Sequence, residues 1–254
     1  MEQKQQSYIK SKNNINKISI IIPVHNEART IGELLKRVVT GCKNISLKKE
    51  IIVVNDGSTD NTKEISENFI KNHKIKDIEI KLFNKNCGGV GKGAPLKLGF
   101  SKATGDILII QDADLEYDPN EYKKLIEPII NGETYCVYGS RLKKKNKISN
   151  PAFLIGGIAI TLATDILFFT NLTDEPTCYK IFHKKLKPII VNAESNGFEL
   201  EPEITAKILR KGYKIKEIPI SYSPRSAKEG KKIKWQDGFI ALKTLFVWRF
   251  KKLD

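Results

Sequence analysis

The sequence predicts an α/β fold in which helices flank a Rossmann-like, mostly parallel central sheet. Two observations support this prediction. Through roughly the first 140 residues, short aliphatic runs alternate with segments whose apolar residues repeat at helical spacing. Several of these runs end in polar or acidic residues, as strands do where an open sheet presents its carboxyl edge to a ligand. The alternation implies parallel strands joined by right-handed crossovers.

Four aliphatic runs define the first part of the expected sheet. They cover residues 18–24, 51–54, 78–83 and 106–111. The helix after the first run is the clearest, because four apolar residues follow the spacing of one helical face. These residues are Ile31, Leu34, Leu35 and Val38. Shorter apolar patterns indicate helices around residues 65–70 and 96–103, so each strand and its helix form one unit of a parallel sheet.

The second half of the chain is less regular. Asp118 and Pro119 indicate a helix start, since proline is favoured at the first helical position, and the apolar residues that follow give this helix a buried face. Three further elements are expected: a strand at 134–138, a helix at 203–210 and a strand near 215–222. Gly212 would end the helix. Pro219 places the last strand at an edge, because proline cannot donate to a central ladder.

Two apolar segments raise the question of a membrane. Residues 152–169 are nearly all apolar and reach the lower length limit of a membrane span. Asp165 near the end of this stretch and two glycines in its middle favour a buried or interfacial helix over a span. Residues 238–250 are compatible with a helix rich in Phe and Trp and flanked by Lys. We expect both segments to contact a membrane interface, with packing into the core as the alternative.

Composition narrows the class of partner. The chain has 254 residues with 44 Lys and Arg against 29 Asp and Glu, a formal net charge of +15. Such a charge attracts nucleic acid, anionic membranes or phosphorylated ligands. The four cysteines include no Cys-x-x-Cys pair, so no structural zinc site is predicted. Residues 1–17 are polar and lack the apolar core of a signal peptide, which leads us to expect reduced thiols and a cytoplasmic location.

Polar residues follow three of the expected strands. Residues 23–27 close the first strand, 56–60 the second, and Asp112 and Asp114 close the fourth. Two carboxylates this close repel unless a cation lies between them. Mg²⁺ is held by one or two carboxylates together with phosphate oxygens. The sequence therefore predicts a divalent metal carrying a diphosphate at this edge, with helix capping as the alternative role of the polar residues.

A glycine-rich turn at 88–93 carries Lys92. It is not a Walker A loop, because Asn86 and Gly93 occupy the positions that need Gly and Ser or Thr. It does not follow the first strand, as a dinucleotide fingerprint would. We expect a tight turn that places Lys92 near phosphate, with ordinary turn chemistry as the alternative.

Taken together, these motifs resemble those of family 2 glycosyltransferases with the A-type fold. They are Pro-Val-His-Asn-Glu, Asn-Asp-Gly-Ser-Thr-Asp, Gly-Lys-Gly-Ala and Asp-Ala-Asp, in this order. The later segments 173–182, 197–203 and 224–232 are similar to those of the dolichol- or polyprenyl-phosphate mannosyltransferase branch. The resemblance covers roughly residues 18–250. It implies an A-type glycosyltransferase fold with a basic, partly helical C-terminal region.

The resemblance implies a role for individual residues. The nucleotide site would contain Pro23, Glu27, Asp56 and Asp112, with Lys92 at the phosphates. The metal, Mg²⁺ or Mn²⁺, would be held by Asp112, Asp114 and Glu116, the last standing where this branch often has Gln. Phosphate and acceptor contacts would come from Arg141, Arg225, Lys231 and Lys232. The residues expected to matter most for catalysis are Asp114, Arg225 and Asp174.

The chain divides into three parts on this interpretation. Residues 1–17 form a polar tail and 18–235 the catalytic domain, with 236–254 as an amphipathic, interfacial C-terminal helix. Within the catalytic domain, 18–116 would be the nucleotide-sugar half and 117–235 the acceptor half. The enzyme would be peripheral, on the cytoplasmic face of a membrane.

The implied reaction is inverting, metal-dependent transfer of a hexose from GDP-mannose or UDP-glucose to polyprenyl or dolichyl phosphate. The transition state would resemble an oxocarbenium ion. A phosphate acceptor is already largely dianionic and needs cations rather than a general base. If a base acts, the first candidate is Asp174, followed by Glu199 and Glu201.

The alternative is the same fold with a saccharide acceptor, in glycan or polysaccharide synthesis, where a base would be essential. No nucleic-acid partner is expected, because the acidic strand ends would repel a phosphate backbone unless metal intervened. The expected partners are a nucleotide sugar, a polyprenyl or dolichyl phosphate and a membrane surface.

Overall fold

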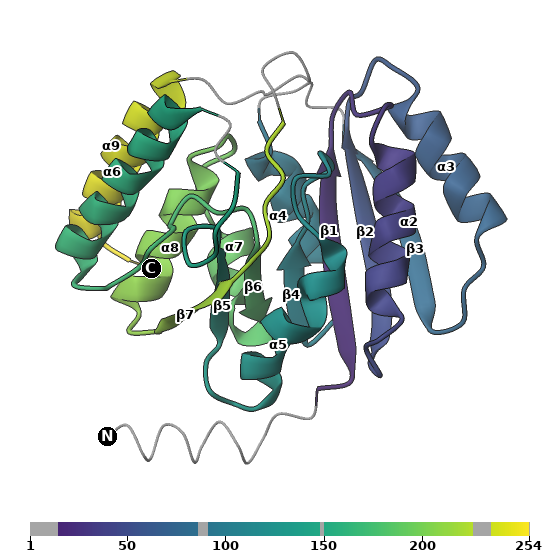
Figure 1. The fold of residues 1–254 in the computed structure, drawn as a ribbon, viewed down its shortest axis with the longest axis horizontal. Helices are drawn as coiled ribbons and strands as arrows, with labels where there is room; N and C mark the ends of the chain where they lie inside the picture. Colours follow the sequence, from purple (N-terminus) through teal and green to yellow (C-terminus); the bar gives the residue numbers. More distant parts are fainter. Residues whose placement is uncertain (1–14, 86–90, 148–149, 226–234, 254) are drawn as a thin grey trace.

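A seven-stranded sheet forms the centre of the protein (Figure 1). The computed structural model describes residues 15–85, 91–147, 150–225 and 235–253. The strands are β1 (Lys17–Val24), β2 (Lys48–Asp56), β3 (Ile78–Lys85), β4 (Ile107–Ile110), β5 (Cys136–Ser140), β6 (Lys180–His183) and β7 (Ile215–Pro219). Their order is β3-β2-β1-β4-β6-β5-β7, and only the two pairings of β6 are antiparallel in this described part. The predicted mostly parallel sheet is confirmed, with β7 at an edge.

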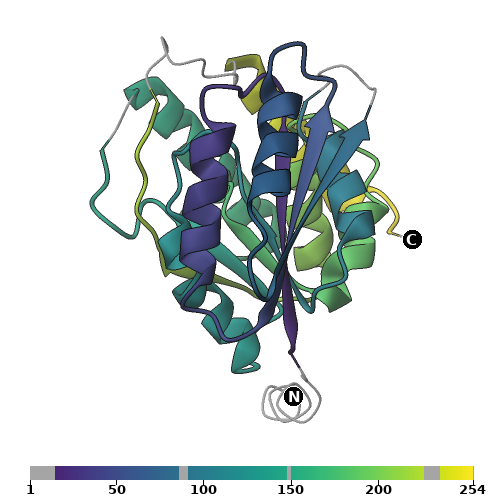
Figure 2. The same ribbon diagram turned by 90° about the vertical axis from the view of Figure 1, so that its right-hand side faces the viewer.

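Helices cover both faces of the sheet. They are α2 (Ile31–Cys42), α3 (Thr62–Asn72), α4 (Gly93–Lys102), α5 (Tyr122–Ile130), α6 (Pro151–Phe168), α7 (Lys187–Val191), α8 (Leu200–Arg210) and α9 (Trp235–Phe250). Alternate strand residues serve the two faces: Ile20 and Ile22 pack with α2, α3 and α5, whereas Ile21 packs with α4, α7 and α8. Figure 2 shows α2 and α3 together on one face. The β1, β2 and β4 residues of these layers are fully buried, so the core extends over both sides of the sheet.

The turn into α5 shows how local sequence sets an element boundary. The Asp118 side chain accepts a hydrogen bond from the Asn120 N–H at 3.0 Å, which caps the first turn. That turn is a 3-10 turn, η1 (Pro119–Glu121), and the α-helix begins at Tyr122. The predicted start at Asp118 and Pro119 is therefore found, with a tighter first turn than expected.

Strand β6 was not predicted from the sequence. It lies between β4 and β5 and runs antiparallel to both. Lys180 interrupts the apolar pattern of this segment, yet it is fully buried in the strand. A second 3-10 turn, η2 (Lys184–Leu186), and α7 follow it. A buried charge concealed this strand, and the partners of Lys180 explain how the charge is tolerated.

Helices α6 and α9 lie side by side at one end of the molecule, left in Figure 1. They pack on α8 through Ile160, Ala206, Leu245 and Trp248. Only three residues of α6 are buried, and its outward side is apolar. Ile155, Leu162 and Ile166 are 67%, 59% and 65% exposed. Packing of this helix into the core, one of the two expectations, is therefore wrong. Of the helices that the structure describes, α6 alone is long and apolar enough to cross a membrane.

Candidate active site at the carboxyl edge of the sheet

The loops that follow β1 and β2 are tied to each other. The Asn26 side-chain oxygen accepts a hydrogen bond from the Thr59 N–H at 2.8 Å, and the Ser58 hydroxyl accepts one from the Asn26 N–H at 3.0 Å. Asn26 adopts a positive φ of 52°, which asparagine tolerates better than most residues. Other residues begin α2 and α3. Asn26, Ser58 and Thr59 therefore connect two loops, and the capping alternative is wrong for these three, whereas Asp60 accepts a hydrogen bond from the Thr62 N–H at the start of α3, at 3.0 Å.

Asp56 ends β2 with a buried carboxylate. It is 2% exposed, and its Oδ1 has no hydrogen-bond partner within the described chain. Pro23 is buried in β1 and is paired with Val54 of β2. An unsatisfied buried oxygen is unfavourable, so this atom is disposed to accept a hydrogen bond from a ligand. The two predicted nucleotide-site residues thus lie on neighbouring strands at the edge where ligands bind in open α/β sheets.

The segment after β4 presents three carboxylates, on Asp112, Asp114 and Glu116. The Asp114 Oδ1 accepts a hydrogen bond from the Glu116 N–H at 3.1 Å. Leu115 has a positive φ of 64°, a conformation that L residues rarely adopt and that often marks functional sites. The Glu116 carboxylate accepts hydrogen bonds from the Tyr222 hydroxyl at 2.7 Å and the Arg225 N–H at 2.9 Å. A compact turn therefore carries three acids in five residues.

Two cations face these carboxylates. The Lys92 Nζ lies 3.2 Å from Asp112 Oδ1. The Arg225 Nη2 lies 3.0 Å from Asp114 Oδ2, and its Nη1 lies 3.7 Å from the Glu27 carboxylate. Four carboxylates predicted for the nucleotide and metal site therefore contact two of the predicted cations. They are Glu27, Asp112, Asp114 and Glu116. Lys231 and Lys232, the other predicted phosphate contacts, lie outside the described residues.

These cations do not fully balance the acids. Burial raises the pKa of Asp114 to about 7, aided by the negative charges of Asp112 and Glu116 and opposed by Arg225. In the described part of the chain, no three His, Cys, Asp or Glu side chains converge as a ready-made metal site. The hard oxygen donors nevertheless match Mg²⁺ or Mn²⁺ in type. The negative charge around Asp114 that the cations leave uncompensated favours the binding of a further cation. Binding of such an ion would require Lys92 and Arg225 to move aside.

Arg141 and Asp174 form a tight pair beside this site. The Asp174 carboxylate accepts hydrogen bonds from the Arg141 backbone N–H, Nε and Nη2 at 2.7, 2.8 and 2.7 Å. The Asp174 N–H in turn donates to Glu217 at 3.0 Å. The Arg141 guanidinium also lies 5.2 Å from the centre of the Tyr222 ring. Because both Asp174 oxygens are engaged, the residue predicted as the first candidate base acts in this structure as a partner of Arg141.

The two other candidate bases differ in surroundings. Glu199 accepts a hydrogen bond from the nearby Gly197 N–H at 3.0 Å, a local contact at the start of α8. Glu201 lies in the first turn of α8 and is 2.5 Å from the Lys92 Nζ. Sequence reasoning missed Tyr222 and Lys180 as neighbours of the site. The only local signal for Lys180 was a lysine within an otherwise apolar and aromatic run.

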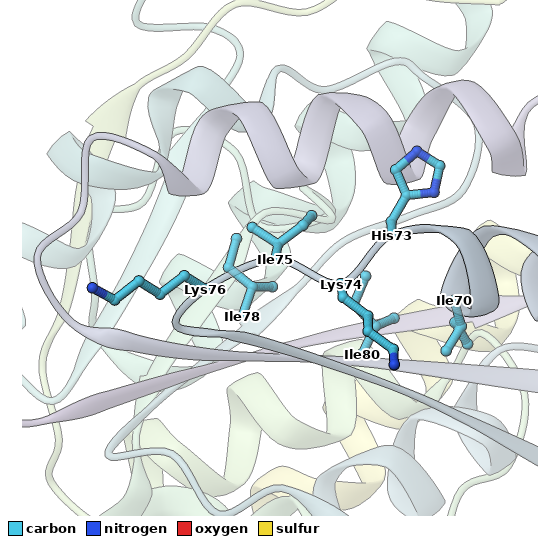
Figure 3. Close-up of a pocket in the computed structure, with 7 residues that line it drawn as sticks. All are labelled: Ile70, His73, Lys74, Ile75, Lys76, Ile78 and Ile80. Atoms are coloured by element: carbon cyan, nitrogen blue, oxygen red, sulfur yellow. The ribbon is translucent and has the colours of Figure 1, made fainter.

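Among the cavities on the described surface, one near the acidic turn and one far from it have volumes of about 410 Å³ each. One adjoins Glu116 and Tyr222 and is lined mainly by polar side chains. The other lies beside the end of α3 and the start of β3 (Figure 3). Its lining residues are Ile70, His73, Lys74, Ile75, Lys76, Ile78 and Ile80. This second cavity contains no carboxylate and is remote from the acidic turn, so the site is assigned to the carboxyl edge.

The fold is an open α/β sheet with acids and cations gathered at its carboxyl edge, and comparison identifies the family. Residues 19–187 match the model of glycosyl transferase family 2, and the chain belongs to that family. It is 37% identical over 134 residues to undecaprenyl-phosphate 4-deoxy-4-formamido-L-arabinose transferase of Proteus mirabilis, covering 52% of this chain and 38% of that protein. It is 30% identical over 227 residues to dolichol-phosphate mannosyltransferase of Pyrococcus furiosus, covering 85% and 59%. The predicted family and branch are confirmed.

The chain thus spans less than two thirds of the length of these two relatives. It also matches an uncharacterized protein of Methanocaldococcus jannaschii at 30% identity, over 85% of both chains. Among solved structures, it is similar to glucosyl-3-phosphoglycerate synthase of Mycobacterium tuberculosis in complex with Mn²⁺, UDP and phosphoglyceric acid. The TM-score is 0.69 at 16% identity, over 98% of this chain and 84% of that one. This likeness confirms the predicted A-type glycosyltransferase fold.

Proposed function

We propose that the protein transfers a hexose from a nucleotide sugar to a polyprenyl or dolichyl phosphate, with inversion at the anomeric carbon. One observation carries the proposal. Three carboxylates, on Asp112, Asp114 and Glu116, face Lys92 and Arg225 at the carboxyl edge of the sheet. The names of the relatives from Proteus mirabilis and Pyrococcus furiosus support a lipid phosphate as acceptor.

The donor would bind across β1, β2 and the acidic turn. The unpartnered Asp56 oxygen would accept a hydrogen bond from the nucleoside, and Lys92 would contact the diphosphate. GDP-mannose and UDP-glucose are the two donors to test. The solved neighbour's complex with UDP and Mn²⁺ supports a nucleoside diphosphate as the leaving group.

Asp112, Asp114 and Glu116 would hold Mg²⁺ or Mn²⁺ once Lys92 and Arg225 release them. The ion would supply positive charge against the charge that develops on the leaving diphosphate. The side chains then have a defined task. Lys92 and Arg225 partly offset the repulsion between the carboxylates in the ligand-free protein, and both would become available to phosphate oxygens when the donor binds.

On the proposed acceptor side, Arg141 supplies a positive charge that is held in place. Arg141 is held by two side-chain hydrogen bonds to Asp174, which leaves the rest of its guanidinium fork for a phosphate. In the proposed reaction an acceptor phosphate oxygen forms a bond to the anomeric carbon while the bond from that carbon to the diphosphate oxygen breaks. No proton need be removed from a dianionic phosphate, so an engaged Asp174 is compatible with turnover.

A lipid acceptor requires contact with a membrane, and α6 and α9 offer it. Both present large apolar side chains outward, including Ile155 and Ile166 on α6 and Phe239, Phe246 and Phe250 on α9. Lys251 and Lys252 at the end of α9 are exposed, as expected where an interfacial helix meets anionic lipid. We propose that these two helices lie in a membrane interface, and the expected cytoplasmic face is part of this proposal.

The test is release of nucleoside diphosphate from GDP-mannose and UDP-glucose with Mg²⁺ or Mn²⁺, with and without a polyprenyl phosphate in detergent. Turnover that requires both metal and lipid phosphate is expected for one donor. Turnover that responds to saccharides and ignores lipid phosphate would overturn the acceptor and support the alternative. Binding of neither donor would overturn the proposed function.

A further inference from the structure

A chain of buried charges extends from the acidic turn into the acceptor half. Lys92 Nζ contacts both Asp112, at 3.2 Å, and Glu201, at 2.5 Å. The other Glu201 oxygen contacts Lys180 Nζ at 3.2 Å, and Lys180 lies 3.8 Å from Glu175. The five charges come from five separate places: the turn before α4, the end of β4, β6, α8 and the loop after α6. The chain therefore links the metal-side carboxylate to the interior of the other half.

The interior members of this chain are secured. Lys180 is 0% exposed and Glu175 is 1% exposed, a position that lysine and glutamate occupy only when paired. Glu175 also accepts a hydrogen bond from the Thr205 hydroxyl at 2.7 Å. Burial raises the pKa of Glu201, but Lys180 and Lys92 more than offset this effect and hold the pKa below its usual value. Glu201 is thus a fixed anion whose position is set by β6 and α8.

Lys92 by contrast is shared. It lies in the turn after the glycines, and its ammonium contacts one carboxylate of the site and one carboxylate of the network. It also lies 3.2 Å from the Cys178 sulfur. Lys180 neutralises one side of Glu201, and the remaining oxygen, for which the described chain supplies no hydrogen bond of good geometry, forms an ion pair with the Lys92 ammonium. A lysine held between two anions keeps one contact when the other anion takes a different cation.

We propose that Glu201, fixed by Lys180, is a positioning residue that shares the Lys92 ammonium with Asp112, so that Lys92 neutralises Asp112 only in part and stays ready for the donor diphosphate. This inference rests on the proposed function. With a divalent ion on Asp112, Lys92 would stay paired with Glu201, and its charge would be available to phosphate oxygens. Glu201 therefore contributes to donor binding without being a base. The role differs from that of Arg225, whose carboxylate partners in the described chain, Glu27, Asp114 and Glu116, lie at the carboxyl edge of the sheet.

Mn²⁺ binding to the free enzyme separates the two residues. In Lys92→Met the competing cation is lost, so Mn²⁺ should bind several-fold more tightly, as measured by electron paramagnetic resonance without nucleotide. In Glu201→Gln, Lys92 has Asp112 as its remaining anion and neutralises it more fully, so Mn²⁺ should bind several-fold more weakly. Equal shifts in the same direction, or no shift in Glu201→Gln, would overturn the proposal.

Diphosphate binding provides the second readout. UDP and GDP are titrated into the enzyme by calorimetry with Mg²⁺ present. Lys92→Met and Glu201→Gln should each raise the dissociation constant of whichever nucleotide binds by about tenfold, as expected for the loss of one charge-assisted contact. Because both act through the same ammonium, the double variant should also lose about tenfold. A hundredfold loss in the double variant would mean independent roles and would overturn the proposal.

The matched control is Glu203→Gln on the same helix. Glu203 is also fully buried and pairs with Lys207 at 2.6 Å, but it has no contact with Lys92. It should lower stability without changing either binding constant. Glu201→Asp retains the charge beside Lys180 with a shorter reach, and should weaken diphosphate binding like Glu201→Gln even if the latter folds poorly. If wild-type enzyme binds neither UDP nor GDP, the proposed function fails, whereas wild-type binding with an unaffected Glu201→Asp variant rejects this inference alone.

Discussion

Two carboxylates at opposite ends of the parallel strands have opposite properties. Glu50, near the start of β2, accepts hydrogen bonds from Lys17, Ser19 and the Thr104 N–H at 2.8, 2.5 and 2.6 Å. Burial opposes its ionisation, but these donors outweigh burial and lower its pKa to about 2. Asp114, after the end of β4, is also largely buried, and its pKa is raised to about 7.

The difference lies in how completely each charge is satisfied. Glu50 is surrounded by donors from β1 and from the turn after α4, so its charge stabilises the fold. Asp114 has one guanidinium and one N–H, and two other acids lie close by. Placing acids together without enough donors is unfavourable for folding and is typical of sites that bind a cation or a reacting group. The amino end of these strands therefore carries stability, and the carboxyl end carries the proposed chemistry.

The largest expected effect is at the unsatisfied end. Asp114→Asn removes one predicted metal ligand while leaving the size of the side chain nearly unchanged. We expect kcat/KM to fall about a thousandfold, the value of several kcal/mol of lost charge stabilisation. The melting temperature without metal should be maintained, because a like-charge contact is also removed. A variant with normal turnover and normal Mn²⁺ response would contradict the assignment.

Glu50→Gln is the matched change at the satisfied end. It should lower the free energy of unfolding at pH 7 by ~3 kcal/mol, the value of a pKa lowered from 4.5 to about 2. Because the folded-state pKa is depressed, this contribution is present above pH 4.5 and is lost as pH falls toward 2. Urea unfolding at pH 7, 4 and 3 should show the wild type and variant converging in acid. Transfer activity of the folded variant at pH 7 should stay within about twofold.

The sequence predicted those parts of the fold whose signals are local. Uniform aliphatic runs identified β1, β2 and β4, and Asp112 and Asp114 were found because both follow one such run. Strand β6 was missed because Lys180 is neutralised by Glu201 of α8 and by Glu175, neither of which a local pattern reveals. The α6 segment is nearly all apolar, and two of its few polar residues, Thr161 and Thr164, are buried, so its polar pattern did not reveal which side is exposed.

The composition of the site was predictable only in part for the same reason. Tyr222 donates to Glu116 across 106 positions of sequence, and Arg225 meets Asp114 across 111. Such contacts follow from the docking of the segment after β7 over the acidic turn, and periodicity carries no information about that docking. Asp174 was chosen as a base from its residue type and motif. The three hydrogen bonds from Arg141 that engage it are visible only in the structure.

The outward side of α6 is a further region without partners in the described chain, and it is apolar instead of charged. Replacing Ile155 and Ile166 together by Glu should lower binding to anionic lipid vesicles at least about tenfold, since each exposed side chain would otherwise bury apolar area in the interface. Vesicle sedimentation measures this loss, and nucleotide binding should be unchanged. Ile130→Glu, at an apolar residue 43% exposed at the end of α5, is the control. Equal vesicle binding by all three proteins would remove α6 from the membrane model.

Asp174 tests whether the role of a carboxylate follows from its location in the sheet or from how fully it is hydrogen-bonded. It lies at the carboxyl edge and yet is as fully paired as Glu50. If pairing determines the role, Asp174 positions Arg141 and does not remove a proton. Asp174→Asn should then raise the KM for lipid phosphate about tenfold with little change in kcat, because one charge-assisted hydrogen bond to the guanidinium is lost. The shape of the pH–rate profile should be unchanged, since no titrating base is removed.

Combining Asp174→Asn with Arg141→Met gives the clearest outcome. A positioning role predicts that the double variant is no worse than Arg141→Met alone, because Asp174 acts through that guanidinium. A catalytic base predicts a further loss in kcat and the disappearance of the acidic limb of the profile. The second result would favour a hydroxyl acceptor over a lipid phosphate, because an alcohol needs its proton removed and a dianionic phosphate does not.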